Sequence, residues 1–295
     1  MPAITTCFRE DLTVDHEFIA RHCRWLVDQG CTGIVTPGSL GEGTTLTGDE
    51  KTELWKTCVH SVGNRVPVVA AISALSTAEA VALAGQAARL GCQGLMVLPP
   101  YVYRGDWREM KSYLLAVMNA TPLSCMLYNN PVAYGTDFLP EHIEELAHEQ
   151  GNLSAVKESS TDVRRVTAIR ARVAERLQIL VGVDDAIVEG LGMGAVGWIA
   201  GLANALPQES VRLFELAFPH QHDEALALYR WFLPLLRMDT VPKFVQLIKL
   251  VQQEVGMGNA RVRPPRLELV GSELEEALGT IRRALKSRPT LQPIS

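Results

Sequence analysis

The chain has 295 residues, of which 47% are hydrophobic and 21% charged, and its 28 Lys and Arg against 33 Asp and Glu give a net charge of −5. This hydrophobic content excludes a disordered chain, and the acidic balance argues against a nucleic-acid partner, which usually requires a basic patch. We therefore expect a soluble globular protein with a sizeable core, built as one large domain or two unequal ones.

Eight short apolar runs, rich in β-branched residues, follow one another along the chain. They lie at residues 4–8, 33–37, 66–72, 94–98, 123–129, 153–158, 178–183 and 197–202. Most are spaced by roughly 25–33 residues, the length of one strand, one crossover helix and two loops. Their nearly continuous apolar character suits parallel strands that are covered on both faces.

Helix-start signals lie between these runs. The sequences TGDE at residues 47–50, STAE at 76–79 and LPE at 139–141 place a capping residue or a proline at a first turn. Eight strand–helix units within about 215 residues predict an α/β fold, a (β/α)₈ TIM barrel. An open doubly wound sheet is the alternative, and it would also have to carry eight uninterrupted parallel units.

Beyond the eighth unit the pattern changes to helices alone. Three helical stretches are predicted at residues 222–237, 241–256 and 272–285, and the first carries a broad apolar stripe that includes Trp231 and Phe232. We expect a catalytic barrel over residues 1–215 and a C-terminal three-helix appendage over 216–295, packed on the barrel or against another subunit.

Three features bear on the compartment. The first residues, MPAITTCFRED, contain no basic region followed by an apolar stretch, so no secretory signal is expected. The six cysteines form no CxxC pair and lie mostly among apolar neighbours, which favours reduced thiols in the cytoplasm. Residues 190–208 are uncharged with two GxxxG spacings, but their five glycines and Pro207 argue against a membrane helix.

The strongest chemical candidate is Lys157. A barrel of this kind places its active site at the carboxyl ends of its strands, and Lys157 follows the apolar residues 153–156 inside a predicted buried strand. Burial disfavours the charged form of a lysine, and the free amine can attack a carbonyl or imine carbon. Two alternatives also account for a lysine at this position: an ion pair with Glu158, or a side chain that reaches out to solvent.

Two further features lie at predicted strand ends. Tyr128 ends the preceding strand, where its hydroxyl would enter the same opening and move protons; a core tyrosine with a satisfied hydroxyl is the alternative. The glycine-flanked loop 38–41 either offers backbone N–H groups to a carboxylate or simply turns the chain. No two histidines join a carboxylate at metal-ligand spacing, and no P-loop, Rossmann or GxSxG motif occurs, so no metal site is expected.

In their order along the chain, GSLGE at residues 38–42, YNNP at 128–131 and KES at 157–159 resemble the signatures of the dihydrodipicolinate synthase/N-acetylneuraminate lyase superfamily. The resemblance covers nearly the whole chain and implies that Lys157 forms a Schiff base with the carbonyl carbon of a 2-oxo acid. No dissociable cofactor is then needed. It also implies that the Tyr128 hydroxyl and the loop hydroxyl relay protons.

The resemblance extends to the other site residues. It makes Ser39 the loop hydroxyl, with the Ser39 and Leu40 backbone N–H groups holding the substrate carboxylate. Further substrate contacts are expected from Gly38, Ala133 and Ile199. The family commonly forms tetramers built from dimers, so we expect a homo-oligomer, tetramer or dimer, that takes a small 2-oxo or imino acid.

The chain departs from the lysine-biosynthetic synthases of this superfamily at three places. Leu40 replaces the second hydroxyl residue of the loop, and Ala133 stands where those enzymes have an arginine that binds the aldehyde substrate. Val102 replaces a tyrosine that is supplied to a neighbouring subunit. These changes argue against that synthase activity.

A closer similarity is to the branch that acts on 1-pyrroline-4-hydroxy-2-carboxylate. PAITT at residues 2–6, GVDD at 182–185 and LYRWF at 228–232 resemble that branch outside the general signature. The expected function is therefore a Schiff-base-forming lyase/hydrolase, a 1-pyrroline-4-hydroxy-2-carboxylate deaminase. A 2-keto-3-deoxy sugar acid aldolase or dehydratase, or a synthase-like pyruvate aldolase, is the alternative, and a non-catalytic barrel is disfavoured because both Lys157 and Tyr128 are present.

Overall fold

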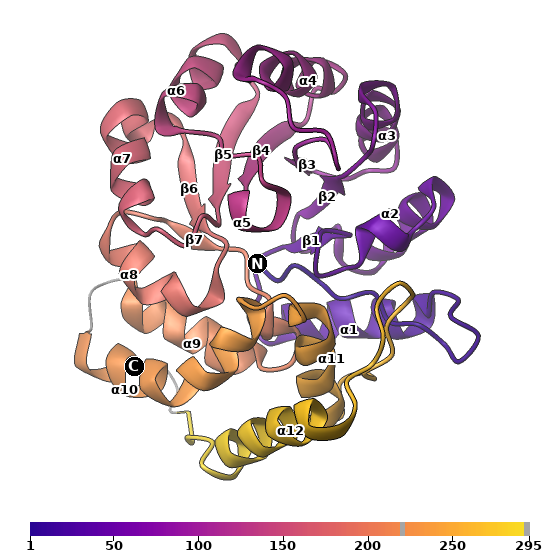
Figure 1. Cartoon of the computed structure of the whole chain (residues 1–295), viewed down its shortest axis with the longest axis vertical. Helices are drawn as coiled ribbons and strands as arrows, with labels where there is room; N and C mark the ends of the chain where they lie inside the picture. Colours follow the sequence, from indigo (N-terminus) through magenta and orange to yellow (C-terminus); the bar gives the residue numbers. More distant parts are fainter. Residues whose placement is uncertain (219–221, 292–295) are drawn as a thin grey trace.

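The computed structural model describes residues 1–218 and 222–291. Short buried strands alternate with helices that lie around the outside of a curled sheet (Figure 1). The strands are β1 (Ile34–Thr36), β2 (Val68–Ile72), β3 (Gly94–Val97), β4 (Ser124–Asn129), β5 (Leu153–Glu158), β6 (Gln178–Val181) and β7 (Gly197–Trp198). Each pairs in parallel with the next along the chain.

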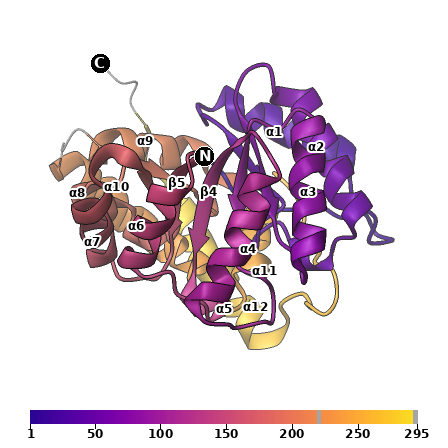
Figure 2. The same ribbon diagram turned by 90° about the horizontal axis from the view of Figure 1, so that it is seen from above.

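The helices follow the strands in the alternation that the spacing predicts. They are α1 (His16–Asp28), α2 (Gly48–Val62), α3 (Thr77–Arg89), α4 (Trp107–Asn119), α5 (Pro131–Tyr134), α6 (Pro140–Glu149), α7 (Arg164–Val173), α8 (Ile187–Gly192), α9 (Pro207–Ala217), α10 (His222–Leu236), α11 (Phe244–Glu254) and α12 (Gly271–Lys286). The three start signals are confirmed, because Thr47 caps α2, Ser76 caps α3 and α6 begins at Pro140. In Figure 2, α1–α3 lie opposite α6–α8, with β4 and β5 between them.

The first predicted strand, residues 4–8, is wrong. The chain start contributes single parallel bridges instead, from Pro2 to Ala200 and from Ala3 to Val35. The Ala3 N–H donates to the Ala200 carbonyl at 2.9 Å, and the Val35 N–H donates to the Pro2 carbonyl at 3.0 Å. These bonds join the β7 side of the sheet to β1, so the seven strands and the chain start form a closed arrangement, consistent with a TIM barrel.

Polar groups explain why residues 5–8 do not extend this edge. The Thr5 N–H donates to the Asn204 side chain at 3.2 Å, and the Thr6 hydroxyl donates to the Gly41 carbonyl at 2.6 Å. These partners belong to loops rather than to a neighbouring strand. The apolar run is therefore buried by loop packing, which a local pattern cannot distinguish from a strand.

The last predicted strand, 197–202, is also shorter than expected. β7 ends at Trp198, because the N–H groups of Gly201 and Leu202 turn to donate to the buried Asp184 carboxylate at 3.0 and 2.7 Å. The uncharged stretch 190–208 is divided among the end of α8, β7, a 3₁₀ turn and the start of α9. Among the described residues, no helix has the length and apolarity needed to cross a membrane.

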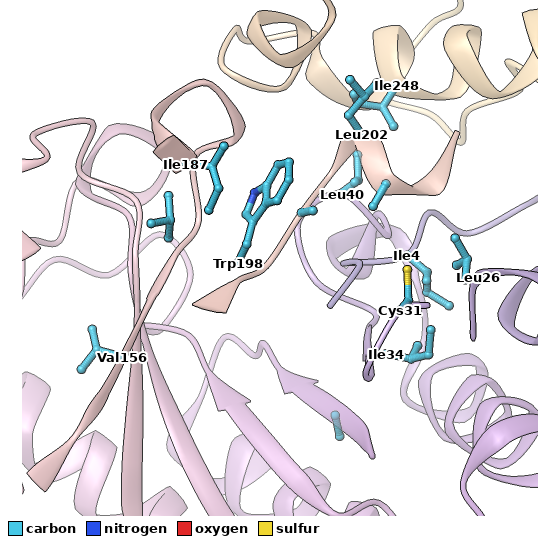
Figure 3. Packing of buried hydrophobic residues seen from close by; sticks show 14 of the residues in the cluster. Ile4, Leu26, Cys31, Ile34, Leu40, Val156, Ile187, Trp198, Leu202 and Ile248 are labelled. Carbon is cyan, nitrogen blue, oxygen red and sulfur yellow. The ribbon is translucent and has the colours of Figure 1, made fainter. Parts of the chain in front are cut away.

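The core has two parts. An inner cluster fills the centre of the curled sheet with Ala3, Val35, Ala71, Met96, Leu98, Met126, Tyr128 and Ile199. A larger cluster lies between strands and helices, and Figure 3 shows some of its members. Ile248 of α11 meets Leu202 there, near Leu40 of the loop after β1. The C-terminal helices therefore pack against the end of the sheet where that loop lies.

Candidate active site

Strands β4 and β5 bring an amine and a phenol together at their carboxyl ends. Tyr128 is the register partner of Lys157, and their exposed fractions are 4% and 6%. The Lys157 Nζ lies 4.1 Å from the centroid of the Tyr128 ring. The Tyr128 hydroxyl accepts a hydrogen bond from the Asn130 amide at 2.9 Å. A buried amine beside a phenol is the pairing that imine chemistry with proton transfer requires.

The two structural alternatives for Lys157 do not hold. Glu158 accepts hydrogen bonds from Asn129 Nδ2 at 3.0 Å and from the Ser160 N–H at 2.6 Å. Among the described residues it forms no ion pair with Lys157, whose side chain is buried rather than extended to solvent. The amine is therefore left facing the ring of Tyr128 and the adjoining cavity.

Gly182, directly after β6, makes room for this lysine. A Cβ at position 182 would lie 2.5 Å from Lys157 Cε and 2.1 Å from Ser159 Oγ. The Ser159 hydroxyl is buried and has no hydrogen-bond partner within the described residues. A side chain at 182 would consequently push both groups away from their places, so the absence of a Cβ is part of how the amine is positioned.

The loop after β1 carries the predicted hydroxyl and carboxylate-binding groups. The Gly43 N–H donates to the Gly38 carbonyl, and the Glu42 N–H donates to the Ser39 carbonyl, each at 3.1 Å. A Cβ at Gly43 would lie 2.5 Å from the Pro37 carbonyl oxygen, so only glycine allows this turn. The Ser39 and Leu40 N–H groups, at the tip of the loop, make no hydrogen bond to any part of the described chain.

A buried ion pair fixes this loop to the C-terminal helices. Glu42 has a left-handed φ of 54° and is fully buried, and its carboxylate pairs with Lys249 of α11. The Arg263 N–H also donates to it at 3.0 Å. The Lys249 ammonium lies 4.5 Å from the centroid of the Phe8 ring. The loop that carries Ser39 is thus held by residues more than two hundred positions away.

One cavity of about 440 Å³ is lined by all seven residues that the sequence predicts for the site. They are Lys157, Tyr128, Ser39, Gly38, Leu40, Ala133 and Ile199. A volume of this size suits a small organic acid. Of the described residues lining it, Lys157 and Arg266 supply the cationic side chains and Asp239 the carboxylate. The geometry therefore offers a buried amine, hydroxyl groups and a limited positive charge.

Two carboxyl groups, the buried Asp184 and the half-buried Asp239, lie on the β6–β7 side. Burial raises the pKa of Asp184 to about 6, against the lowering effect of N–H donors that include the Trp198 indole at 2.9 Å. Asp239 ends the 3₁₀ turn Arg237–Asp239 and lines the cavity. Burial, reinforced by the nearby Asp184, raises the pKa of the Asp239 carboxyl well above its usual range, and Lys157 opposes that rise.

Sequence reasoning nominated seven of the residues that line the cavity and missed others, among them Tyr134, Gly182, Asp239 and Arg266. Gly182 lies at the end of a predicted strand, where a barrel places its active site, so its position could have indicated a site residue. Tyr134 lies three residues after the end of the YNNP motif, and that closeness was a second signal. Asp239 and Arg266 come from the helical tail, and no local pattern there marks them. Among the described residues, no group of three or more His, Cys, Asp or Glu could hold a metal ion.

Comparisons with known proteins identify the family. Residues 1–284 match the sequence pattern of the dihydrodipicolinate synthetase family. The chain belongs to this family. A 4-hydroxy-tetrahydrodipicolinate synthase from Prochlorococcus marinus (strain NATL2A) is 31% identical over 289 residues, which cover 97% of this chain and 94% of that protein.

Solved structures resemble the whole fold. The 4-hydroxy-tetrahydrodipicolinate synthase of Methylacidiphilum fumariolicum SolV has a TM-score of 0.92 at 26% identity, covering 97% of this chain and 95% of that one. The dihydrodipicolinate synthase of Acinetobacter baumannii, solved with pyruvate, has a TM-score of 0.90 at 26% identity, covering 96% and 97%. The protein is therefore an enzyme, a Schiff-base lyase of class I within this family.

Proposed function

We propose that Lys157 is the nucleophile and that Tyr128 and Ser39 carry the protons. The observation that supports this most is the buried Lys157 amine, 4.1 Å from the Tyr128 ring centroid, in a cavity that Ser39 also lines. The free N–H groups of Ser39 and Leu40 would hold the substrate carboxylate. An uncharged amine attacks the imine or carbonyl carbon, and the resulting cationic nitrogen then withdraws electrons from the neighbouring carbon.

We propose that the substrate is 1-pyrroline-4-hydroxy-2-carboxylate. Lys157 attacks the ring C=N carbon, C2, and the ring nitrogen leaves that carbon as an amine on C5. A proton then leaves C3 and the 4-hydroxyl departs as water. This elimination leaves a C3=C4 double bond. A proton lost from C5 and one gained at C3 convert it into a C4=C5 enamine, which tautomerises to an imine at C5, and water releases ammonia there. A second water frees C2 from Lys157. One water is formed and two are consumed, so the net reaction takes up one water and yields 2-oxoglutarate semialdehyde and ammonia.

The lining of the cavity supports a substrate with one carboxylate. Leu40 is buried at the loop position where the lysine-biosynthetic synthases have a second hydroxyl, and Ala133 brings no charge. Arg266, the cationic lining group besides Lys157, lies 3.9 Å from Glu42, which already offsets part of its charge. A second substrate carboxylate would therefore meet little positive potential.

A pyruvate-dependent aldolase is the second candidate, and the relatives favour it. Two of the proteins named above are 4-hydroxy-tetrahydrodipicolinate synthases, and the third is a dihydrodipicolinate synthase that was solved with pyruvate. A 2-keto-3-deoxy sugar acid aldolase or dehydratase uses the same amine and phenol. These activities differ in the second half of the substrate, which the loop around Ala133 would contact.

A substrate panel separates these candidates. The purified chain is assayed with the pyrroline acid, with pyruvate plus aspartate semialdehyde, and with 2-keto-3-deoxy sugar acids, and kcat/KM is compared. Ammonia release from the pyrroline acid is expected to be the fastest reaction. Faster condensation of pyruvate with aspartate semialdehyde would overturn the deaminase assignment while leaving the role of Lys157 intact.

We also propose the assembly and the organisation of the chain. Large apolar side chains are exposed at Val102 (92%), Leu75 (68%) and Tyr103 (52%), which supports a homo-oligomer, and sedimentation would determine its size. Residues 1–215 would form the barrel and 216–295 the helical appendage, of which 219–221 and 292–295 lie outside the described residues. The six cysteines are unpaired and buried, which supports a reducing, cytoplasmic location.

A further inference from the structure

The hydroxyl of Tyr134 forms a hydrogen bond with the Ser39 hydroxyl. The Tyr134 ring lies edge-on to the Tyr128 ring, with centroids 5.9 Å apart and planes at 80°. Tyr134 also lines the cavity. Nothing in the sequence analysis assigned this tyrosine a role, yet it stands in contact with the residue proposed to move protons.

Local structure holds Tyr134 in this position. Helix α5 is a single turn from Pro131 to Tyr134, and the Asn130 side chain caps it by accepting from the Ala133 N–H at 2.9 Å. The same Asn130 amide donates to the Tyr128 hydroxyl. Gly135 ends the turn with a φ of +70°, which favours glycine. One asparagine thus orients the two tyrosines on either side of it.

The electrostatic surroundings keep Tyr134 a proton donor. Burial raises the pKa of its phenol well above the usual value, and the neighbouring Tyr101 and Tyr128 hydroxyls add to the rise. The phenol therefore stays protonated around neutral pH. Because a hydroxyl can donate and accept at once, Ser39 can give its proton to a substrate while taking the proton of Tyr134.

We propose that Tyr134 acts through Ser39 as the second hydroxyl of a proton relay that lies within one chain. The proposal rests on the function proposed above. When the C4–O bond breaks, the Ser39 proton goes to the departing hydroxyl and the Tyr134 proton goes to Ser39. The proton released from C3 then restores Tyr134, so no net proton is gained or lost and the hydroxyl leaves as water.

The relay does not depend on a tyrosine from a neighbouring subunit. Val102, where the resemblance places such a tyrosine, has no hydroxyl, is 92% exposed and has a φ of +72°. Tyr134 supplies a phenol at Ser39 from the same chain instead. The phenol therefore comes from the same chain rather than from a neighbouring subunit, and Tyr134 is a positioning residue for the reaction.

The test is Tyr134→Phe, with Tyr113→Phe as the matched control. Tyr113 is a buried tyrosine whose hydroxyl has no hydrogen-bond partner within the described part of the chain, and it does not line this cavity. Tyr134→Phe should lower kcat roughly 100-fold, within the range of general acid–base effects. It should leave KM nearly unchanged and leave borohydride trapping on Lys157 intact, a split that a merely structural role would not give. Tyr113→Phe should leave kcat at the wild-type value.

A double-mutant comparison covers the case in which Tyr134→Phe perturbs the fold. If Ser39 and Tyr134 act as a unit, Ser39→Ala combined with Tyr134→Phe should be no slower than the slower single variant. Additive losses, an unchanged kcat in Tyr134→Phe, or a loss of borohydride trapping in that variant would each overturn the relay. Absence of trapping in the wild-type protein would instead overturn the proposed function, so the two failures are distinguishable.

Discussion

Replacing Gly182 by alanine tests whether the space beside the amine is needed for catalysis. The added Cβ would lie 2.5 Å from Lys157 Cε and 2.8 Å from Lys157 Cγ. Non-bonded carbons prefer separations of about 3.5–4.0 Å, so the lysine would have to move by about 1 Å. A misplacement of this size costs roughly 100-fold in rate. Overpacking would also lower the free energy of unfolding by about 1–3 kcal/mol, which leaves the fold intact.

The assay measures kcat/KM with the preferred substrate, together with the rate of borohydride-trapped adduct formation. Gly192→Ala is the control, because a Cβ at that helical position would meet no described atom within 4 Å beyond its chain neighbours and its own helix backbone. Gly182→Ala should lose roughly 100-fold in kcat/KM and form the adduct slowly, whereas Gly192→Ala should match the wild type. Wild-type activity in a folded Gly182→Ala protein would refute the view that the position of Lys157 is set by this glycine.

Two further predictions concern the charges around the site. Lys249→Met removes the nearer ion-pair partner of the buried Glu42 carboxylate and leaves only Arg266, at 3.9 Å, among the described residues, so it should lower the free energy of unfolding in urea by about 3–5 kcal/mol. Unchanged stability would show that Glu42 does not need the lysine. The raised pKa of Asp239 means that the folded state keeps a proton on this carboxyl at pH values where the unfolded state has released it. The free energy of unfolding should therefore fall as the pH rises from about 3.8 through the raised pKa of the folded state. Urea titrations at a series of pH values should show a smaller fall in the free energy of unfolding for Asp239→Asn than for the wild type. An equal fall in both proteins would contradict this prediction.

Most of the barrel could be predicted because parallel strands buried on both faces are continuously apolar. Strands β2 to β6 lie within the predicted runs for that reason. The run at residues 4–8 has the same apolar signal, but Thr5 and Thr6 bond to loops brought in from elsewhere in the fold. A local pattern contains no information about those distant partners, so this strand was the one wrongly predicted.

The site residues that lie at strand ends could be predicted from the sequence, whereas those brought in by a short helix or by the C-terminal tail could not. Lys157 and Tyr128 belong to neighbouring strands, and their closeness follows from parallel register. Tyr134 reaches Ser39 only because a one-turn helix folds back over the cavity. Asp239 enters from the C-terminal tail, and its place depends on how that tail packs on the barrel.

The central claim is that Lys157 forms a covalent imine with the substrate. Its most direct test is borohydride reduction in the presence of the pyrroline acid or pyruvate, followed by mass spectrometry of the digested chain, with Lys157→Ala as the control. The account predicts one stable adduct on the peptide that contains Lys157 and none in the variant. An adduct on a different lysine, or none in an actively turning-over wild-type enzyme, would contradict it.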